Sequence, residues 1–205
     1  YPAIPAEDGT GPFKYVDTAS SRAGIAAVNA KLTGQRIGIV GLGGTGSYVL
    51  DLVAKTEVAE IQLIDGDVFS QHNAFRAPGA PSIEELQERP QKARRFAALY
   101  ANMHGGIVAH DAFLGPDNLF LLDGLDFGIV RVTASTPDTR ALAERHISFA
   151  DNDAAANEYA TNIQIAELNA LNAALAVIQW KKLCGIYRDT CQAVYTGYAI
   201  APGEI

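Results

Sequence analysis

The sequence contains few cysteines and no long apolar run, and each absence excludes a class of protein. The 205 residues include two cysteines, Cys184 and Cys191, which are too few for a disulfide framework and favour a reducing, cytoplasmic location. No apolar stretch approaches the roughly 20 residues that a membrane-spanning helix needs. We therefore expect neither a disulfide-rich secreted domain nor a protein with a membrane partner.

Basic clusters are scarce, and metal-ligand patterns are absent from the sequence. The 23 acidic and 16 basic residues give a formal net charge of −7, which argues against a nucleic-acid partner. Two close basic pairs, Arg94–Arg95 and Lys181–Lys182, are interpreted as solvated helix faces. No ligand spacing connects the four histidines, so none is expected to bind a metal: His72, His104, His110 and His146.

What the sequence does contain is a strand–turn–helix–strand pattern between residues 36 and 67. A β-branched run, Ile37–Val40, predicts a buried parallel strand, and a second apolar run, Ile61–Ile64, ends on Asp65. The segment between them has apolar residues at helical spacing: Val49, Leu50, Val53 and Ala54. Four glycines join the first strand to this helix: Gly41, Gly43, Gly44 and Gly46. This order is that of the βαβ unit that binds nucleotides.

Each part of this unit has a physical role in binding a nucleotide. Gly41 and Gly43 allow a tight turn and a close approach of the backbone to phosphate, and Gly46 lets the helix pack against the strands. Unpaired N–H groups at the start of the helix favour an anion. Asp65 follows Gly46 by 19 residues, where its carboxylate can accept hydrogen bonds from ribose hydroxyls. A glycine-rich connector in an unrelated α/β fold is the alternative interpretation.

The polar residues beyond the second strand are not explained by a plain dehydrogenase fingerprint. Together with the glycine turn they resemble the ThiF/MoeB family, the bacterial relatives of the ubiquitin-activating enzymes. The resemblance covers residues 36 to about 125, and Ala77 stands where the family often has Gln. The residues that carry it are Gly41, Gly43, Gly44, Gly46, Ser47, Asp65, Asp67, Val68, Asn73 and Arg76.

The resemblance implies a Rossmann-like, doubly wound α/β fold with a mainly parallel sheet and helices on both faces. It also implies ATP and Mg²⁺ as cofactors and a ubiquitin-like or sulfur-carrier protein as the partner. Some relatives hold a structural zinc ion with two C-x-x-C pairs, which this sequence lacks. The cofactor-binding residues that it implies are Gly41, Gly43, Gly44, Gly46, Ser47, Asp65, Asp67 and Asn73.

Catalytic roles are implied for three basic residues. Arg76 and Lys92 would neutralise phosphate charge, Lys92 from the first turn of a helix predicted over Gln91–Met103. Arg22 would reach across a dimer to the nucleotide phosphates of the other subunit. The alternative for Lys92 and Arg22 is an ordinary solvated side chain.

The N-terminal part of the chain is expected to consist of two pieces. Residues 1–17, which include three prolines, predict an extended arm ahead of a single nucleotide-binding domain over residues 18–205. Asp17 is expected to cap a helix that runs to about Leu32 and ends at Gly34.

The C-terminal part contains the longest predicted helix, Thr161–Leu183. This helix has two apolar stripes, and one domain is expected to cover only one of them, which predicts a homodimer. The last apolar segment, Ala193–Ala199, is expected to form an antiparallel strand that closes the edge of the sheet.

The family pattern breaks down after Phe127. A fourth strand begins at Asp126, but Gly128–Thr133 already has the character of a later strand, and a parallel crossover needs roughly a dozen residues. We therefore predict that a segment is missing near residues 127–129. The family's magnesium-binding Asp has no matching position, so no metal ligand is assigned.

The residues that carry the family resemblance favour ATP-dependent adenylation of the C-terminal carboxylate of a ubiquitin-like or sulfur-carrier protein. A non-catalytic scaffold subunit on the same fold is the first alternative, because the magnesium ligand is unmatched. In many relatives a second step moves the acyl group to a cysteine, and the candidate for that role is Cys191. An NAD- or FAD-dependent oxidoreductase is the second alternative, and it leaves four residues unexplained: Asp67, Asn73, Arg76 and Lys92.

Overall fold

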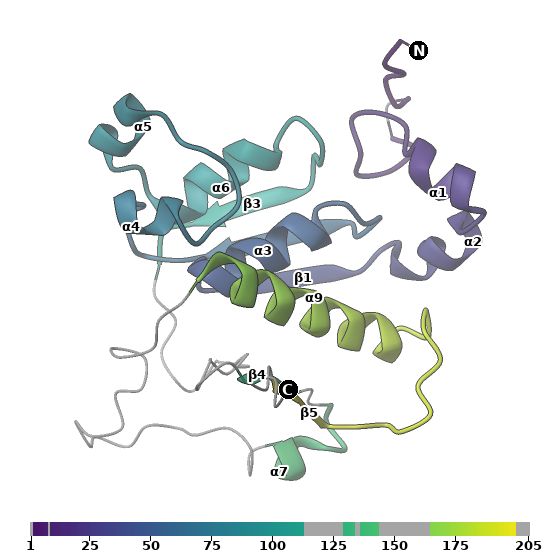
Figure 1. The fold of residues 1–205 in the computed structure, drawn as a ribbon. Coiled ribbons are helices and arrows are strands. Elements are labelled where there is room, and N and C mark those ends of the chain that lie inside the picture. The colour runs from purple at the N-terminus through teal and green to yellow at the C-terminus, as the bar shows by residue number, and fades with distance from the viewer. Residues whose placement is uncertain (1, 8, 113–128, 134–135, 144–164, 200–205) are drawn as a thin grey trace, which may run out of the picture.

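The computed structural model describes residues 2–7, 9–112, 129–133, 136–143 and 165–199 (Figure 1). Residues 126–128, which contain the start of the predicted fourth strand and most of the predicted break near 127–129, therefore lie outside the described residues. The first residues of the predicted long helix, 161–164, lie outside them as well.

Three parallel strands form the sheet that carries the glycine turn (Figure 1). β1 (Arg36–Val40) pairs with β2 (Glu60–Ile64), and β2 pairs with β3 (Ile107–His110), in the order β1-β2-β3. The two crossovers contain α3 (Gly44–Val53) and α6 (Lys92–Tyr100), as parallel pairing requires. This arrangement confirms the predicted Rossmann-like α/β fold with a parallel sheet.

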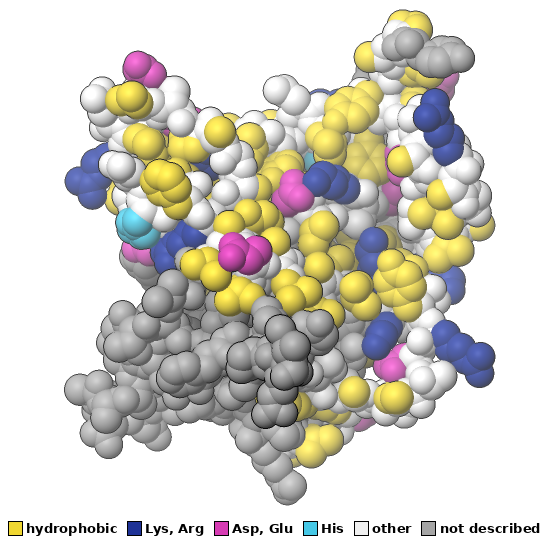
Figure 2. Space-filling model, viewed as in Figure 1, with side chains coloured by type: hydrophobic (Ala, Val, Ile, Leu, Met, Phe, Trp, Pro, Cys, Tyr) yellow, Lys and Arg dark blue, Asp and Glu magenta, His cyan; other side chains and the backbone are white. Residues whose placement is uncertain are grey.

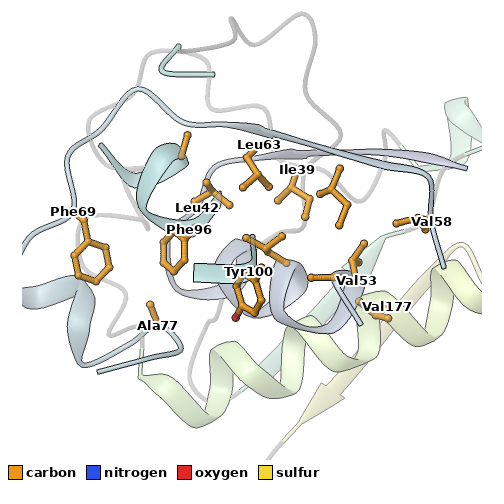
Figure 3. Close-up of a cluster of buried hydrophobic side chains, with 14 of the residues drawn as sticks. Ile39, Leu42, Val53, Val58, Leu63, Phe69, Ala77, Phe96, Tyr100 and Val177 are labelled. Atoms are coloured by element: carbon orange, nitrogen blue, oxygen red, sulfur yellow. The ribbon is translucent and has the colours of Figure 1, made fainter. Parts of the chain in front are cut away.

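The hydrophobic core lies on one face of this sheet. Side chains alternate along a strand, so the register places Ile39, Leu63 and Ala109 side by side on that face. Leu50 of α3 and Phe96 of α6 belong to the same core cluster, and both are fully buried. Figure 3 shows Phe96 with Ile39 and Leu63 in this cluster. Burial of a side chain such as Leu50 stabilises the fold by about 1.5–3 kcal/mol. This packing fixes the carboxyl ends of β1 and β2 relative to each other.

The N-terminal region departs from the predicted single helix. Asp17 caps α1 (Thr18–Ala23) as predicted, because its carboxylate accepts two backbone N–H groups of the first turn. The helix then ends at Gly24, which has φ +67°, and the chain continues as α2 (Ala26–Asn29) and the 3-10 helix η1 (Ala30–Leu32). The prediction of one continuous helix was wrong because Gly24 adopts the left-handed conformation that ends a helix.

The described residues of the predicted arm fold back on themselves. Pro5 and Tyr15 form an antiparallel bridge, and Phe13 bridges to His104. The rings of Phe13 and His104 also meet edge to face, with their centroids 5.9 Å apart. The segment is thereby attached to the turn that follows α6. The division into an arm and a domain at residue 17 stays a prediction.

The C-terminal region adds a helix and a second sheet. α9 (Ala166–Leu183) packs along α3 (Figure 1). β4 (Ile129–Thr133) and β5 (Tyr195–Ala199) form a separate two-stranded antiparallel sheet. β5 is thus antiparallel, but it pairs with β4 and not with the three-stranded sheet, so the predicted antiparallel edge is not confirmed.

The two predicted stripes of α9 differ in burial. One stripe contains Ala173 and Val177, which are both buried, and Val177 belongs to the core cluster. The other stripe contains Ile165 and Ile178, which are 38% and 40% exposed. Among the described residues, no helix has both the length and the apolar character needed to cross a membrane.

Short helices complete the described chain: α4 (Gln71–Ala74), α5 (Ile83–Glu88) and α7 (Arg140–Ala143). The basic pair on α6 corrects a prediction. The Arg94 side chain is 76% exposed, but Arg95 is buried, with its guanidinium carbon 3.9 Å from the centre of the Phe69 ring. Only half of this pair is therefore a solvated face.

Candidate nucleotide-binding site

The glycine turn connects the end of β1 to the start of α3. Gly41 has φ +81°, a left-handed conformation that favours glycine. A Cβ at Gly46 would lie 1.9 Å from the Gly41 carbonyl oxygen, so only glycine fits there. Gly43 is the N-cap residue of α3 and provides no side-chain cap, and the space beside its Cα is open. The start of α3 is therefore bare backbone, with unpaired N–H groups of the kind that bind phosphate.

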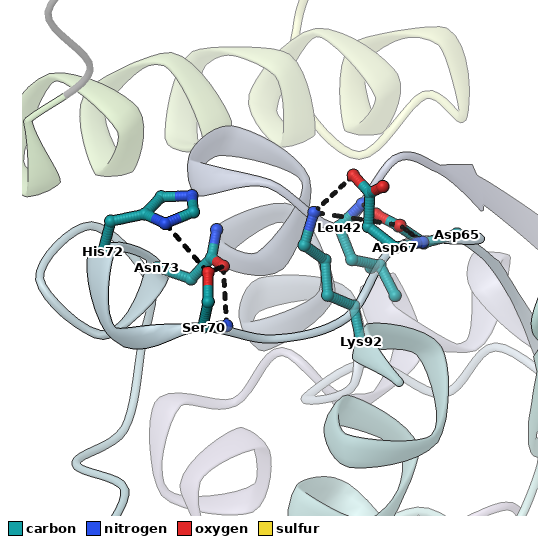
Figure 4. A network of polar contacts seen from close by, with 7 residues as sticks. All are labelled: Leu42, Asp65, Asp67, Ser70, His72, Asn73 and Lys92. Carbon is teal, nitrogen blue, oxygen red and sulfur yellow. Dashed lines mark hydrogen bonds and ion pairs between the residues drawn. The ribbon is translucent and has the colours of Figure 1, made fainter. Parts of the chain in front are cut away.

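Asp65 ties the end of β2 to this turn. Its Oδ2 accepts a hydrogen bond from the backbone N–H of Leu42 at 2.6 Å, and its Oδ1 accepts one from Asp67 at 2.8 Å (Figure 4). The residue is 7% exposed. Each carboxylate oxygen has two lone pairs, so each retains one for a further donor. The geometry is compatible with the predicted ribose contact, which stays a prediction.

Lys92 is the first residue of α6 and points back to the same acids. Its backbone N–H donates to the Asp67 carbonyl at 2.9 Å. Its Nζ lies 2.8 Å from Asp67 Oδ2 and 3.9 Å from Asp65 Oδ1 (Figure 4). The Lys92 side chain is 9% exposed, whereas that of Asp67 is 60% exposed. An incoming anion can therefore replace Asp67 at the ammonium at little cost, because the exposed Asp67 carboxylate remains solvated by water.

Asn73 is fixed in the loop after β2 with one polar atom left over. Its Oδ1 accepts from the N–H and the hydroxyl of Ser70, at 2.9 and 3.0 Å, which closes a capping box at the start of α4 (Figure 4). Asn73 is 2% exposed, and its Nδ2 has no hydrogen-bond partner among the described residues. A buried donor without a partner costs about 1–3 kcal/mol. A ligand oxygen at this atom would remove that cost.

His72 lies within electrostatic reach of three charged side chains, Arg76, Lys92 and Asp67. Burial lowers the pKa of His72, and the nearby positive charges of Arg76 and Lys92 lower it further, while Asp67 raises it. Figure 2 shows a histidine over α4 beside a basic side chain. Arg76, Lys92 and Asp67 thus lie close enough to His72 for their charges to act on it. Arg76 and Lys92 are the two of these groups that are expected to act on phosphate.

Two predicted residues are not part of this cluster within one chain. Ser47 is fully buried, and its hydroxyl donates to the Gly44 carbonyl of its own helix at 2.8 Å. Arg22 is exposed on α1, which lies beside the end of β1 opposite to α4 (Figure 1). A role for Arg22 at a nucleotide would require a second subunit, and that role stays a prediction.

The structure also shows the surroundings of the two cysteines and of the possible metal ligands. Cys191 is exposed, and its N–H donates to Asp189 Oδ1 at 3.2 Å; Cys184 is half-buried beside Gln35. In the part of the chain that the structure describes, no group of three or more His, Cys, Asp or Glu residues could hold a metal ion.

One residue near the site was missed by the sequence analysis. Asn169 of α9 is fully buried. The Thr45 hydroxyl donates to its Oδ1 at 3.1 Å, and its Nδ2 donates to the Arg76 carbonyl at 3.3 Å. An Asn between the apolar stripes of a helix was the available signal, because such a residue is buried only when it is hydrogen-bonded.

A family model connects this geometry to known proteins. The model described as the ThiF family matches residues 19–127, which is just over half of the chain. The chain belongs to the ThiF family. The match contains the glycine turn, Asp65 and Lys92, and the resemblance drawn from the sequence is thereby confirmed. Asn169 lies beyond it.

Solved structures with the same fold accompany this match. MccB of E. coli is 16% identical, with a TM-score of 0.59 over 83% of this chain and 60% of that chain. MccB solved together with MccA gives 15% identity and a TM-score of 0.63 over 90% and 69%. The E. coli tRNA N6-threonylcarbamoyladenosine dehydratase TcdA gives 16% and 0.55 over 82% and 92%. This chain therefore spans about three-fifths of the MccB structure first named. No curated protein matches it significantly.

Proposed function

We propose that this ThiF-family protein binds ATP and adenylates a carboxylate. The finer proposal is that the carboxylate is the C-terminus of a ubiquitin-like or sulfur-carrier protein and that the enzyme works as a cytoplasmic homodimer. Residues 18–205 would act as one nucleotide-binding domain. The observation that carries the proposal is the meeting of a bare helix start with Lys92, Arg76 and Asn73 at the carboxyl edge of the sheet.

ATP is favoured over NAD because the site has more phosphate-directed groups than a dinucleotide needs. The turn at Gly41–Gly46 and the acid Asp65 serve either nucleotide. Lys92 adds a buried ammonium, and Asn73 adds an unpartnered buried amide. Both suit a chain of phosphates that changes charge during a reaction.

The proposed reaction needs positioning and charge neutralisation. A carboxylate oxygen of the substrate attacks the α-phosphorus of ATP, and the bond to the bridging oxygen breaks. The electron pair of that bond leaves with pyrophosphate, and an acyl-adenylate remains. No proton has to move in this step. Lys92 would exchange Asp67 for phosphate oxygens and, with Arg76, stabilise the negative charge that develops on them.

Magnesium is the cation that we propose enters with ATP. The described residues offer no cluster of metal ligands, so none of them is assigned to the ion. Asp67 is exposed but paired with Lys92. This gap is also what favours the second candidate, a scaffold subunit that binds a nucleotide or partner without catalysis.

Exchange of pyrophosphate into ATP tests the proposal directly. The protein would be incubated with ATP, magnesium, labelled pyrophosphate and candidate carrier proteins, with carriers lacking the C-terminal residue as controls. Exchange that depends on an intact carrier terminus is expected. Calorimetry with ATP–magnesium and with NAD gives a second readout, and tighter binding of NAD would contradict the adenylation proposal. Binding of ATP without exchange would favour the scaffold.

The homodimer has its own test. Light scattering at micromolar concentration should give twice the monomer mass. If Arg22 acts across the dimer, Arg22→Ala should lower exchange, and mixing it with a subunit inactivated at Lys92 should restore part of the activity. A monodisperse monomer would remove any role for Arg22 at the nucleotide.

A further inference from the structure

We infer that Asn169 is a positioning residue that holds the start of α3 and the Arg76 loop at a fixed separation for a bound nucleotide. The inference rests on the proposed function, because it deepens the description of the same site. Asn169 lies 42 residues beyond the end of the family match at residue 127, on a different element. It makes contact with both phosphate-directed parts of the site.

The first contact is with the glycine turn. Thr45, in the first turn of α3, donates its hydroxyl to Asn169 Oδ1 at 3.1 Å. The Asn169 amide also lies against Gly44, where a Cβ would come within 2.0 Å of Nδ2. Gly44 thus serves a helix–helix contact, whereas the space beside Gly43 is open. The amide therefore fixes the position of the helix start that is bare toward the ligand.

The second contact is with the loop that carries Arg76. Asn169 Nδ2 donates to the Arg76 carbonyl oxygen at 3.3 Å. Three residues earlier in the same loop, the buried Nδ2 of Asn73 has no hydrogen-bond partner among the described residues. One planar amide therefore joins two segments that are 31 residues apart in the chain, counted from Thr45 to Arg76.

Burial and helix propensity show that this Asn is not an ordinary helix residue. Asn169 is 0% exposed, and Asn is a poor helix former. A Leu or Ala at this position would favour both the helix and the core. What Asn provides is one acceptor and one donor in a rigid plane, each used on a different part of the site. A catalytic site tolerates little displacement of its groups, so a fixed separation has a direct effect on binding.

The experiment uses the full chain and matched threonine variants at the two ends of α3. Thr45→Val removes the hydroxyl that binds Asn169 and keeps the shape of the side chain. Thr56→Val is the control, since its hydroxyl bonds the Val53 carbonyl at the other end of the helix. We expect Thr45→Val and Asn169→Ala to weaken ATP–magnesium binding by about tenfold, the loss of one or two hydrogen bonds. Thr56→Val should bind ATP as the unchanged protein does.

A double variant separates positioning from simple loss of stability. Gly44→Ala should lower both the melting temperature and the affinity for ATP, because the new methyl group meets the Asn169 amide. In the Asn169→Ala background there is room for that methyl group, so Gly44→Ala should cost much less. Asn169→Asp keeps the acceptor for Thr45 but places a buried carboxylate oxygen against the Arg76 carbonyl and a negative charge near the phosphates, so its affinity should fall at least as far as that of Asn169→Ala.

The outcomes separate this inference from the proposed function. If the unchanged protein binds ATP, and Thr45→Val and Asn169→Ala bind it equally well, the positioning role is overturned and the proposed function stands. If the melting temperatures show the Gly44–Asn169 coupling but the unchanged protein binds no ATP, the proposed function fails and takes the positioning role with it.

Discussion

Two buried cations in the first half of α6, Lys92 and Arg95, use positive charge in opposite ways. Lys92 and Arg95 lie one turn apart and are 7% and 8% exposed. Lys92 faces two carboxylates and the open site, whereas Arg95 pairs with Glu85 and lies over the rings of Phe69 and Phe96. Burial alone therefore does not identify a functional cation. The surroundings do, since one cation faces groups that a ligand can displace and the other is enclosed by aromatic side chains.

The largest effect on activity is expected from removing the charge of Lys92. Lys92→Met keeps most of the apolar stem and should lower pyrophosphate exchange about a hundredfold or more, because a preorganised charge at a transferring phosphoryl group contributes about 3 kcal/mol. The melting temperature should change little, because Asp67 is exposed and Asp65 keeps its two backbone hydrogen bonds. Exchange assays and thermal melts measure the two effects.

Lys55→Met is the control for this prediction. Lys55 also pairs with an acid, Asp51 at 2.7 Å, but its side chain is 50% exposed and it lies just beyond the far end of α3. It should leave exchange unchanged. Full exchange activity in Lys92→Met would remove the distinction between Lys92 and Arg95.

Substitution of Arg95 should lower stability and leave the exchange activity of the folded protein unchanged. Arg95→Ala removes the stacking on Phe69 and the pair with Glu85, and we expect the free energy of unfolding to fall by about 2–3 kcal/mol. Arg95→Met should cost less, because it keeps the stem in place and no longer buries Nη1, which has no hydrogen-bond partner among the described residues. Chemical denaturation measures both losses.

The folded fraction of these Arg95 variants should bind ATP normally. Arg94→Ala, at a side chain that is 76% exposed, is the neighbouring control and should change stability by no more than about 0.5 kcal/mol. A folded Arg95→Met protein that cannot bind ATP would mean that both buried cations of α6 serve the nucleotide.

This comparison also shows what the sequence could predict. The glycine turn, Asp65 and Lys92 lie in one continuous stretch, where the βαβ unit fixes which residues meet at the carboxyl edge. The burial of Arg95 depends on Phe69, which lies in the loop after β2. No pattern in the residues around Arg95 indicates that this ring will cover it. Helical spacing places Lys92 and Arg95 near each other but does not indicate which one faces a ligand.

The misses have similar physical causes. Asn169 reaches the site from more than 90 residues away, counted from Arg76, so no local pattern could reveal it. Gly24 ended the first helix because a left-handed C-cap is favoured by contacts of the backbone, which an apolar periodicity does not report. β5 found its partner in β4 and not in the main sheet, and strand partners depend on tertiary packing.

The smallest expected effect comes from a third buried nitrogen group, the His104 ring, which has no hydrogen bond or ion pair with an acid among the described residues. His104 is 1% exposed; its Nε2 lies 3.0 Å from the Val58 carbonyl oxygen and its Nδ1 accepts from the Gly106 N–H at 3.1 Å. This pattern fits the neutral ring with the proton on Nε2. Burial lowers the pKa of His104 below its ordinary value of 6.5. Unlike Lys92 and Arg95, it should therefore stay uncharged in the folded protein.

Stability should then fall as the pH drops below about 6.5, because the unfolded chain takes up a proton that folded His104 does not. The slope from this one group is at most about 1.4 kcal/mol per pH unit, and it ends once the pH is below the folded pKa. His104→Gln can still donate to the Val58 carbonyl but does not titrate. Its free energy of unfolding should be lower than that of the unchanged protein at pH 8, and the difference should shrink between pH 7 and pH 5. A constant difference over that range would mean that His104 titrates normally and that burial without an acid does not keep this ring neutral.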